Sequence, residues 1–519
     1  MPKRSRVKRE PIRPILAAIL AGGIFFILSS IWALSTPPSS VPDEASHFIR
    51  AAAVAHGEFY GTAGDAHNGT VYVDVPAGVA YSHNFTCNAF KPDITVTTCM
   101  DQRPTDPSAT VSTSTTAGLN APGYYILTGW PSLLINGDSS LYAMRLAGAL
   151  VASIPVAILF GALTRLRVGR WPYLAVGAIL TPMTFYLSGS VNPNGLEATS
   201  ILAVFATTLL LSRKTLSTRA TLGYLALMLI SGVLLMSTRS ISILWLVIAL
   251  AVGLLMGEGK VIGALLRRPV TWIIGALGVI AGLATVGWYL TAPDVGSPPP
   301  GGLMRGEFGT ALAMLNSTGN QIIGWIGEFG WLDTPAPIFT PIVWGGAILI
   351  TFIVGFSVAG KKNRLIIAGL LAVTLFMPTV VQTMVVHELG QIWQGRYMLA
   401  MALLTLLVCS IVMSDARLPW PSIRRPALAV FALLWAAHVA AYILVIKRYS
   451  IGINYPLLQM FVAPTWTTPF GIPILALIIA FSLVLAGGLW LLWKLADSVP
   501  LDEDALDLRR LREPEALRA

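Results

Sequence analysis

Apolar stretches long enough to cross a lipid bilayer recur along the whole of this 519-residue chain. The hydrocarbon core of a bilayer is about 30 Å thick, and about 20 helical residues cross it. A segment in lipid must satisfy its own backbone hydrogen bonds, so each stretch is expected to be a helix. The sequence therefore predicts an all-α integral membrane protein with about 12 transmembrane helices. They are expected near residues 14–34, 141–163, 172–190, 196–212, 220–236, 239–256, 271–290, 337–358, 365–384, 397–414, 426–446 and 470–494.

The composition supports this class of protein. Hydrophobic residues make up 55% of the chain and charged residues 12%, against roughly 45–50% and 25% in soluble domains. The first apolar run, at 14–34, follows a basic segment and so resembles a signal peptide. It is longer than the roughly 7–15 residues of a signal-peptide core, and no small-residue cleavage site follows it. We therefore expect an uncleaved first transmembrane helix.

The connections between the apolar stretches alternate in charge. One set, together with both chain ends, carries 26 of the 35 lysine and arginine residues, and the other set carries 9. Basic connections face the cytoplasm in membrane proteins. This rule predicts that both termini are cytoplasmic. The net charge of +10 then reflects the orientation of the chain in the membrane. It predicts contact with the lipid bilayer and not with nucleic acid.

The same alternation divides the chain into segments. Two extracytoplasmic loops are large, at 35–140 and 291–336, and the first is too long for a simple connector. We expect a small folded elaboration in that loop. Helices two to seven fall within 141–290 and helices eight to twelve within 337–494. A basic N-terminus at 1–13 and a charged tail at 495–519 are expected in the cytoplasm.

Two of the three cysteines lie in the first large loop. Cys87 and Cys99 are twelve residues apart, and a disulfide is expected if the loop is outside the cytoplasm. The alternative is a pair of free thiols. Cys409 lies within an apolar run and is expected to be inert.

The segment PPSSVPDEASHFIR follows the outer end of the first helix. A helix is expected to begin near Ser40 and to run along the membrane surface, so that Asp43, His47 and Arg50 share one face. The adjacent carboxylates of Asp43 and Glu44 beside a histidine suit general-base chemistry on a hydroxyl. A capping box from Ser40 to Asp43 is the competing interpretation.

Other polar and aromatic residues gather at the same outer ends of the spans. Each has an ordinary explanation in turn chemistry, in the helix dipole or in anchoring at the headgroups. The functional interpretation is binding of substrate and phosphate, because a guanidinium binds phosphate through two hydrogen bonds. The residues concerned are Arg145, Asn192, Asn194, Glu197, Arg239, Trp325, Glu328, Trp331, Asp333, Glu388, Trp393, Gln394, Arg396 and Tyr397.

Five short elements, PDEASHF, NAPGYY, SVNPNG, FGWLDTP and QGRY, occur in this order between residues 41 and 397. As a set they resemble the bacterial membrane proteins called Domain of Unknown Function 2142. That family is similar to the C-type (GT-C) glycosyltransferase superfamily. Its members have many membrane helices and an acidic residue or pair in the first outer loop, and they use polyprenyl-phosphate sugars as donors.

The resemblance implies a GT-C-like architecture with surface helices and a catalytic base at Asp43 or Glu44, with Asp43 preferred. The family form has proline after the acidic pair, where this chain has Ala45 and Ser46. The implied function is transfer of a sugar from a polyprenyl-phosphate donor to a cell-envelope glycan or glycolipid by an inverting single displacement. Arg239 and Arg396 are the candidates for holding the leaving phosphate.

Two other classes of function remain open. A glycolipid transporter or flippase predicts ionisable residues near the middle of the membrane, repeated halves and broken helices. A non-catalytic partner of an envelope-polysaccharide assembly complex needs no acidic pair near the bilayer. The sequence has no obvious ligand set for a metal, so the need for a divalent cation is also open, as are the sugar and the acceptor.

Overall fold

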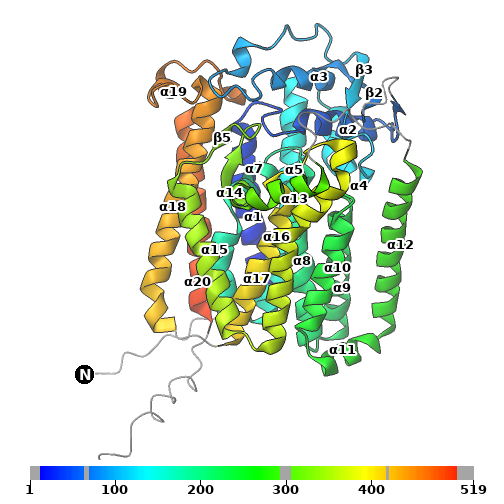
Figure 1. The fold of residues 1–519 in the computed structure, drawn as a ribbon, viewed down its shortest axis with the longest axis vertical. Helices are drawn as coiled ribbons and strands as arrows, with labels where there is room; N and C mark the ends of the chain where they lie inside the picture. Colours follow the sequence, from blue (N-terminus) through cyan, green and yellow to red (C-terminus); the bar gives the residue numbers. More distant parts are fainter. Residues whose placement is uncertain (1–11, 64–68, 293–305, 417–419, 500–519) are drawn as a thin grey trace, which may run out of the picture.

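The chain is a bundle of long, nearly parallel helices with folded loops gathered at one end (Figure 1). The computed structural model describes residues 12–63, 69–292, 306–416 and 420–499. The basic N-terminus and the charged tail expected from the sequence therefore lie almost wholly outside the described residues. We call the end of the bundle that carries residues 35–63, 69–137, 306–338, 390–398 and 452–473 the loop face.

Within the described residues, ten helical segments are long and apolar enough to cross a membrane. Nine are single helices and the tenth is α17 together with the short helix η4 that precedes it, and each falls on a span expected from the sequence. The multi-pass helical membrane fold is therefore confirmed. The segments are α1 (Pro14–Leu34), α5 (Asp138–Leu166), α8 (Pro193–Arg213), α9 (Thr218–Met236), α12 (Pro269–Thr291), α15 (Phe339–Val358), α16 (Lys361–Leu389), η4 (Gly395–Met398) with α17 (Leu399–Asp415), α18 (Trp420–Ile451) and α20 (Ile474–Ser498).

The span expected at 239–256 is shorter than predicted. Its helix α10 (Ser242–Leu255) has 14 residues, and α11 (Gly259–Leu266) follows at an angle of 118°. Together the two helices satisfy the same criterion for a span, which brings the total to eleven.

The span expected at 172–190 is not one continuous helix, so that prediction is wrong. It is divided into α6 (Trp171–Ile179) and α7 (Pro182–Ser188). Pro182 cannot donate a backbone hydrogen bond and disfavours a helical residue before it, while the Thr181 side chain caps α7 by accepting from the Thr184 N–H. The freed carbonyl of Ala178 accepts a hydrogen bond from the Trp344 indole at 2.9 Å. The break therefore keeps its backbone groups satisfied inside the bundle.

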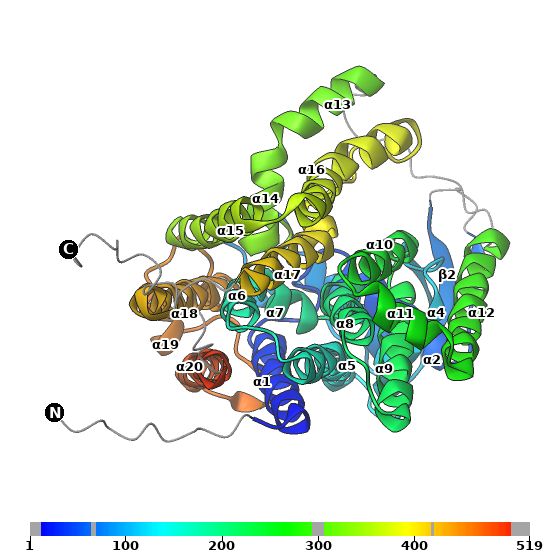
Figure 2. The ribbon, with the colours of Figure 1, turned by 90° about the horizontal axis from the view of Figure 1, so that it is seen from below.

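Seen along the bundle axis, the helices differ in how far the protein encloses them (Figure 2). α8 and α17 are almost wholly buried at the centre, whereas α12 and α15 stand at the rim with apolar side chains exposed. In a bilayer those exposed side chains face lipid. The bundle therefore has a packed centre whose helix ends on the loop face are held in fixed positions.

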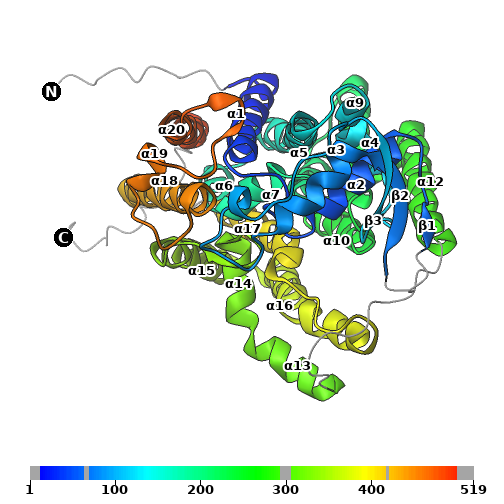
Figure 3. The same cartoon turned by 90° about the horizontal axis from the view of Figure 1, so that it is seen from above.

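The first loop folds into a small layer over the bundle, as expected. β2 (Val71–Pro76) is the middle strand of an antiparallel sheet of order β1–β2–β3, in which Val73 pairs with Thr113. Figure 3 shows this sheet beside α2 on the loop face. The other elements of the loop are α2 (Glu44–Ala55), β1 (Thr62–Ala63), α3 (Ala77–Ala80), η1 (Tyr81–Thr86), η2 (Val96–Thr98), β3 (Thr110–Thr115), α4 (Pro122–Gly129) and η3 (Trp130–Leu133).

Helix α2 differs from the sequence prediction in two ways. It begins at Glu44 instead of near Ser40, because Asp43 has a left-handed backbone (φ 68°) that a right-handed helix cannot include. It is also buried along nearly its whole length against the sheet and α4, so other elements of the first loop cover it.

The other loop-face segments are short. The second large loop contains two helices and a two-stranded antiparallel hairpin, and the later connections contain single helical turns. These elements are α13 (Glu307–Asn316), α14 (Thr318–Gly327), β4 (Glu328–Phe329), β5 (Thr334–Pro335), α19 (Gln459–Val462) and η5 (Pro469–Gly471).

The expected disulfide joins Cys87 and Cys99 within the first loop. Cys409 is buried in α17 with a free thiol. The loop is further tied to α18 by Arg448, which donates to the carbonyls of Asn88 and Ile94. The layer over the loop face is thus fastened to the bundle at several points.

Candidate active site on the loop face

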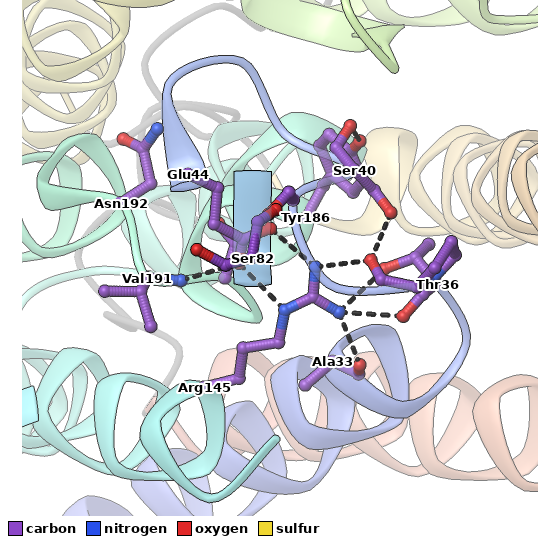
Figure 4. A network of polar contacts seen from close by, with 12 residues as sticks. Ala33, Thr36, Ser40, Glu44, Ser82, Arg145, Tyr186, Val191 and Asn192 are labelled. Carbon is purple, nitrogen blue, oxygen red and sulfur yellow. Dashed lines mark hydrogen bonds and ion pairs between the residues drawn. The ribbon is translucent and has the colours of Figure 1, made fainter. Parts of the chain in front are cut away.

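The two adjacent carboxylates of the PDEASHF element have opposite environments. Glu44 is fully buried and accepts hydrogen bonds from Arg145 of α5, at 2.8 Å from Nε and 2.6 Å from Nη2 (Figure 4). The backbone N–H of Val191 donates to the same carboxylate at 3.0 Å. Arg145 is also fully buried and donates to the carbonyls of Ala33 and Thr36 at the end of α1. Glu44 therefore joins α1, α2, α5 and the turn before α8.

Asp43 instead faces a partly open space. Its side chain is 44% exposed, and its Oδ2 accepts a hydrogen bond from Arg396 Nη2 at 2.7 Å. It makes no side-chain capping bond to α2, so the structure does not support the capping-box interpretation. Its left-handed backbone costs of order 1–3 kcal/mol, and such strain persists only where the surroundings enforce it. The fold therefore holds this carboxylate against Arg396 at an energetic cost.

Arg396 lies in η4, immediately before α17, and its side chain is 4% exposed. Its Nη2 binds Asp43, but Nε and Nη1 have no hydrogen-bond partner among the described residues. Buried guanidinium groups normally have all their donors paired. The side chain borders a small pocket, which is also lined by Pro42, Met183, Tyr186, Leu187, Gly324, Glu328, Leu332 and Gly395. Both nitrogens are buried, and an acceptor that reached the guanidinium would find two nitrogens without a hydrogen-bond partner.

Glu328, at the start of β4, is the carboxylate that lines this pocket. Burial raises its pKa, and the nearby positive charge of Arg396 opposes that shift. Glu328 is therefore easier to protonate than an exposed glutamate, which moderates its repulsion of an anion.

A second arginine lies close by. The Arg239 guanidinium packs over the Tyr397 ring, 3.9 Å from its centre, and donates to Asn194 Oδ1 at 3.1 Å. Asn192 caps α8 by accepting from the Asn194 N–H, and its amide reaches the Pro42 carbonyl at 3.4 Å. The NPNG turn thus contacts Arg239 through Asn194 and the backbone before Asp43 through Asn192.

His47 is the third polar group beside Asp43. Its ring is buried in α2, and the charges acting on it are those of Asp43, Arg396 and Arg239. The pKa of His47 is lowered to about 4, mainly by burial; Asp43 opposes this shift, and the two arginines add to it. The imidazole is therefore neutral at physiological pH.

Several residues expected in the site lie elsewhere. Arg50 does not accompany Asp43 but donates to the carbonyls of Phe59 and Asn120, at 2.6 and 2.8 Å. Asp43 lies outside the helix with a left-handed backbone, so helical spacing does not bring the two side chains to one face. Asp333 is buried against Arg448 at 3.2 Å. Glu388 is exposed near the end of α16.

Of the remaining expected residues, some make structural hydrogen bonds. The surroundings of the others indicate no role. Glu197 is buried in α8, where it accepts a hydrogen bond from Ser242. The Trp331 indole donates to the Ser39 carbonyl at 3.0 Å. In the described part of the chain, the indole nitrogens of Trp325 and Trp393 and the Oε1 atom of Gln394 are buried without hydrogen-bond partners.

No role is predicted from the sequence for Asn120 or Tyr125, although both belong to the NAPGYY element. Tyr125 contacts His47, and Asn120 contacts Tyr125. The positions are visible as a motif, but the contact depends on α4 packing against α2, which periodicity does not show. In the described residues, no group of three or more histidine, cysteine, aspartate or glutamate side chains is arranged to hold a metal ion, so no residues are assigned to a cation.

Comparisons with known proteins agree with the membrane character of the chain. A family model described as "Predicted membrane protein (DUF2142)" matches residues 25–405. No curated protein and no solved structure matches the chain. The matched range contains both sides of the Asp43–Arg396 contact.

Proposed function

This chain belongs to the DUF2142 family of predicted membrane proteins, and we propose that it is a GT-C-type membrane glycosyltransferase. It transfers a sugar from a polyprenyl-phosphate donor to a cell-envelope glycan or glycolipid. The observation that carries the proposal is the contact of a half-exposed carboxylate, Asp43, with a buried guanidinium, Arg396, that retains two unpaired donors. A base and an anion-binding group are both needed when a hydroxyl displaces a phosphate.

In the proposed reaction, Asp43 accepts the proton of an acceptor hydroxyl as the oxygen of that hydroxyl attacks the anomeric carbon. The bond between this carbon and the phosphate oxygen breaks, and its electron pair stays on the leaving polyprenyl phosphate. Attack from the face opposite the leaving group inverts the configuration of the sugar. Arg396 and Arg239 stabilise the charge that develops on the phosphate, which is the kind of interaction that lowers a reaction barrier most.

The environments of the two carboxylates favour Asp43 as the base. A general base must come within hydrogen-bond reach of the proton it takes. Both oxygens of Glu44 are buried and already accept hydrogen bonds from Arg145 or Val191. Asp43 retains exposed surface. The salt bridge to Arg396 also holds the Asp43 carboxylate in a fixed position, with Oδ2 2.7 Å from Nη2.

The depth of the site suits a lipid-linked donor. Asp43, Arg239 and Arg396 each lie at or beside the loop-face end of a helix, where the phosphate of a membrane lipid would be found. By the distribution of basic residues, we propose that the loop face is extracytoplasmic. The polyprenyl chain would then remain among the helices while its headgroup reaches the pocket.

A glycolipid transporter is the second candidate, and the break between α6 and α7 favours it. Discontinuous helices that present unpaired backbone groups are typical of transporter binding sites. Here the freed Ala178 carbonyl is bound by Trp344, and Thr181 donates to the Trp325 carbonyl at 2.7 Å. The break is thus occupied by the protein itself, which makes transport the weaker proposal.

The test is release of polyprenyl phosphate by purified protein in lipid nanodiscs supplied with a panel of polyprenyl-phosphate sugars and envelope-glycan acceptors. Asp43→Asn should fold normally and lose about 10²–10⁴ in rate, the usual contribution of general-base catalysis. Asp74→Asn is the matched control, because Asp74 is exposed on β2 of the same loop and should keep full activity.

Two outcomes would refute the proposal. If Asp43→Asn retains the wild-type rate, this carboxylate is not the base. If no donor in the panel is consumed but labelled glycolipid crosses proteoliposome membranes, the protein is a transporter.

A further inference from the structure

A chain of three polar side chains connects α4 to His47. The Asn120 amide Nδ2 donates to the Tyr125 hydroxyl at 2.8 Å, and that hydroxyl lies 2.9 Å from His47 Nδ1. Tyr125 is fully buried, and its ring stacks on the imidazole at 5.9 Å between centres. His47 Nε2 has no hydrogen-bond partner among the described residues.

The pairing of donors and acceptors among Asn120, Tyr125 and His47 determines which ring nitrogen of His47 carries the proton. The Tyr125 oxygen already accepts from Asn120, and its own proton needs an acceptor. If His47 Nδ1 carried a proton, the Tyr125 proton would remain buried and unpaired, at a cost of about 1–3 kcal/mol. If Nδ1 is bare, it accepts the Tyr125 proton, and both hydrogen bonds of the Asn120–Tyr125–His47 series then have a donor and an acceptor. Burial raises the pKa of Tyr125, so the hydroxyl keeps the proton it donates.

We propose that Asn120 and Tyr125 fix His47 as a neutral imidazole protonated at Nε2, and that this N–H binds a phosphoryl oxygen of the lipid-linked substrate. His47 is then a third ligand for the phosphate, beside Arg396 and Arg239. This role rests on the proposed function, whereas the tautomer does not.

The groups around the ring explain why a neutral donor suits this position. Three charged groups act on the His47 ring: Asp43 favours its protonated form, and Arg396 and Arg239 disfavour it. Tyr125 contacts Nδ1. A protonated imidazole would add a third cation to the two guanidiniums. The neutral ring adds a hydrogen bond without that repulsion, and its contribution should not change between about pH 6 and pH 8.

The first experiment measures the tautomer directly. Solid-state ¹⁵N spectra of histidine-labelled protein in lipid, with the His47 signals assigned by their absence in His47→Gln, should show a protonated Nε2 and a bare Nδ1 from pH 8 to pH 6. Asn120→Asp replaces the amide donor by an acceptor for the Tyr125 proton, so it should move the His47 proton to Nδ1. A doubly protonated ring at pH 7, or a protonated Nδ1 in the unmodified protein, would overturn the assignment.

The second experiment tests the ligand with farnesyl phosphate as a short soluble probe. Its dissociation constant should rise about tenfold in His47→Ala and less in His47→Gln, because glutamine retains an N–H donor. His83→Ala is the control, since His83 lies in η1 and contacts the Ser114 carbonyl. All variants must keep the thermal midpoint of the wild-type protein. If wild type and His47→Ala bind farnesyl phosphate equally well, the phosphate contact is refuted, even if sugar transfer is found. A tenfold loss of this affinity would support the contact, even if no sugar transfer is found.

Discussion

Replacing Glu44 by glutamine should destabilise the fold much more than replacing its neighbour Asp43 by asparagine. Glu44 and Arg145 are both fully buried and share two short hydrogen bonds. Breaking a buried ion pair from one side leaves the other charge uncompensated and costs about 3–5 kcal/mol. Asp43 is 44% exposed, and asparagine keeps an oxygen that can accept the hydrogen bond from Arg396, so this change should cost less. Asparagine also tolerates the left-handed backbone at this position.

The assay can use the one free cysteine in the described residues. Cys409 is buried in α17, so a thiol-reactive fluorogenic dye should label it only when the bundle opens on heating. At roughly 2–4 °C per kcal/mol for a cooperative unit of 150–250 residues, a loss of 3–5 kcal/mol lowers the midpoint by about 6–20 °C. Asp43→Asn should stay within about 3 °C of the wild type.

A second-site change separates charge from shape. Glu44→Gln combined with Arg145→Met removes both charges and should recover part of the lost stability. Recovery will be incomplete because the carbonyls of Ala33 and Thr36 lose their donor. A Glu44→Gln variant that melts like the wild type would refute the buried-pair argument. One that melts normally but is inactive would move the catalytic role from Asp43 to Glu44.

Three further predictions follow from the site, the first loop and the charge distribution. Arg396→Lys should weaken turnover and donor binding although the charge is kept, because lysine lacks the planar fork, whereas Arg103→Lys, on the exposed pair with Asp138, should have no effect. Cysteine-to-alanine changes at Cys87 and Cys99 should cost roughly 3 kcal/mol of stability, and non-reduced peptide mass spectrometry should recover the linked pair; two freely alkylated thiols would contradict it. An impermeant thiol reagent applied outside the cell should label Thr110→Cys and not Thr215→Cys, and the reverse pattern would invert the proposed topology.

The helical membrane fold could be predicted because lipid leaves the backbone few alternatives. Ten of the expected spans are found as segments that meet the length criterion, and hydropathy alone located them. The α6–α7 break was missed although Pro182 is visible in the sequence. A proline inside an apolar run either kinks a helix or divides it, and the outcome depends on distant partners such as Trp344, which binds the freed Ala178 carbonyl.

The candidate site was predictable as a set of motifs but not as a set of contacts. Asp43, Arg396 and Arg239 were recognised as polar residues at helix ends, and the structure brings them near His47. The different environments of the two carboxylates could not be foreseen, because they depend on Arg145, which lies 101 residues from Glu44. Spacing along one helix also misplaced Arg50, since Asp43 lies outside the helix with a left-handed backbone.

Two buried arginines on the loop face show how structural and functional charge can be told apart. Every nitrogen of Arg145 donates a hydrogen bond to Glu44 or to a backbone carbonyl, so the pair is complete and has no capacity for a ligand. Arg396 is nearly as buried, yet only one of its three nitrogens has a partner. Each unpaired buried donor costs about 1–3 kcal/mol in the absence of ligand. A bound phosphate would supply the missing acceptors and recover that cost on binding. The unsatisfied arginine therefore favours a ligand site beside Asp43, while the satisfied one explains why Glu44 is held in place.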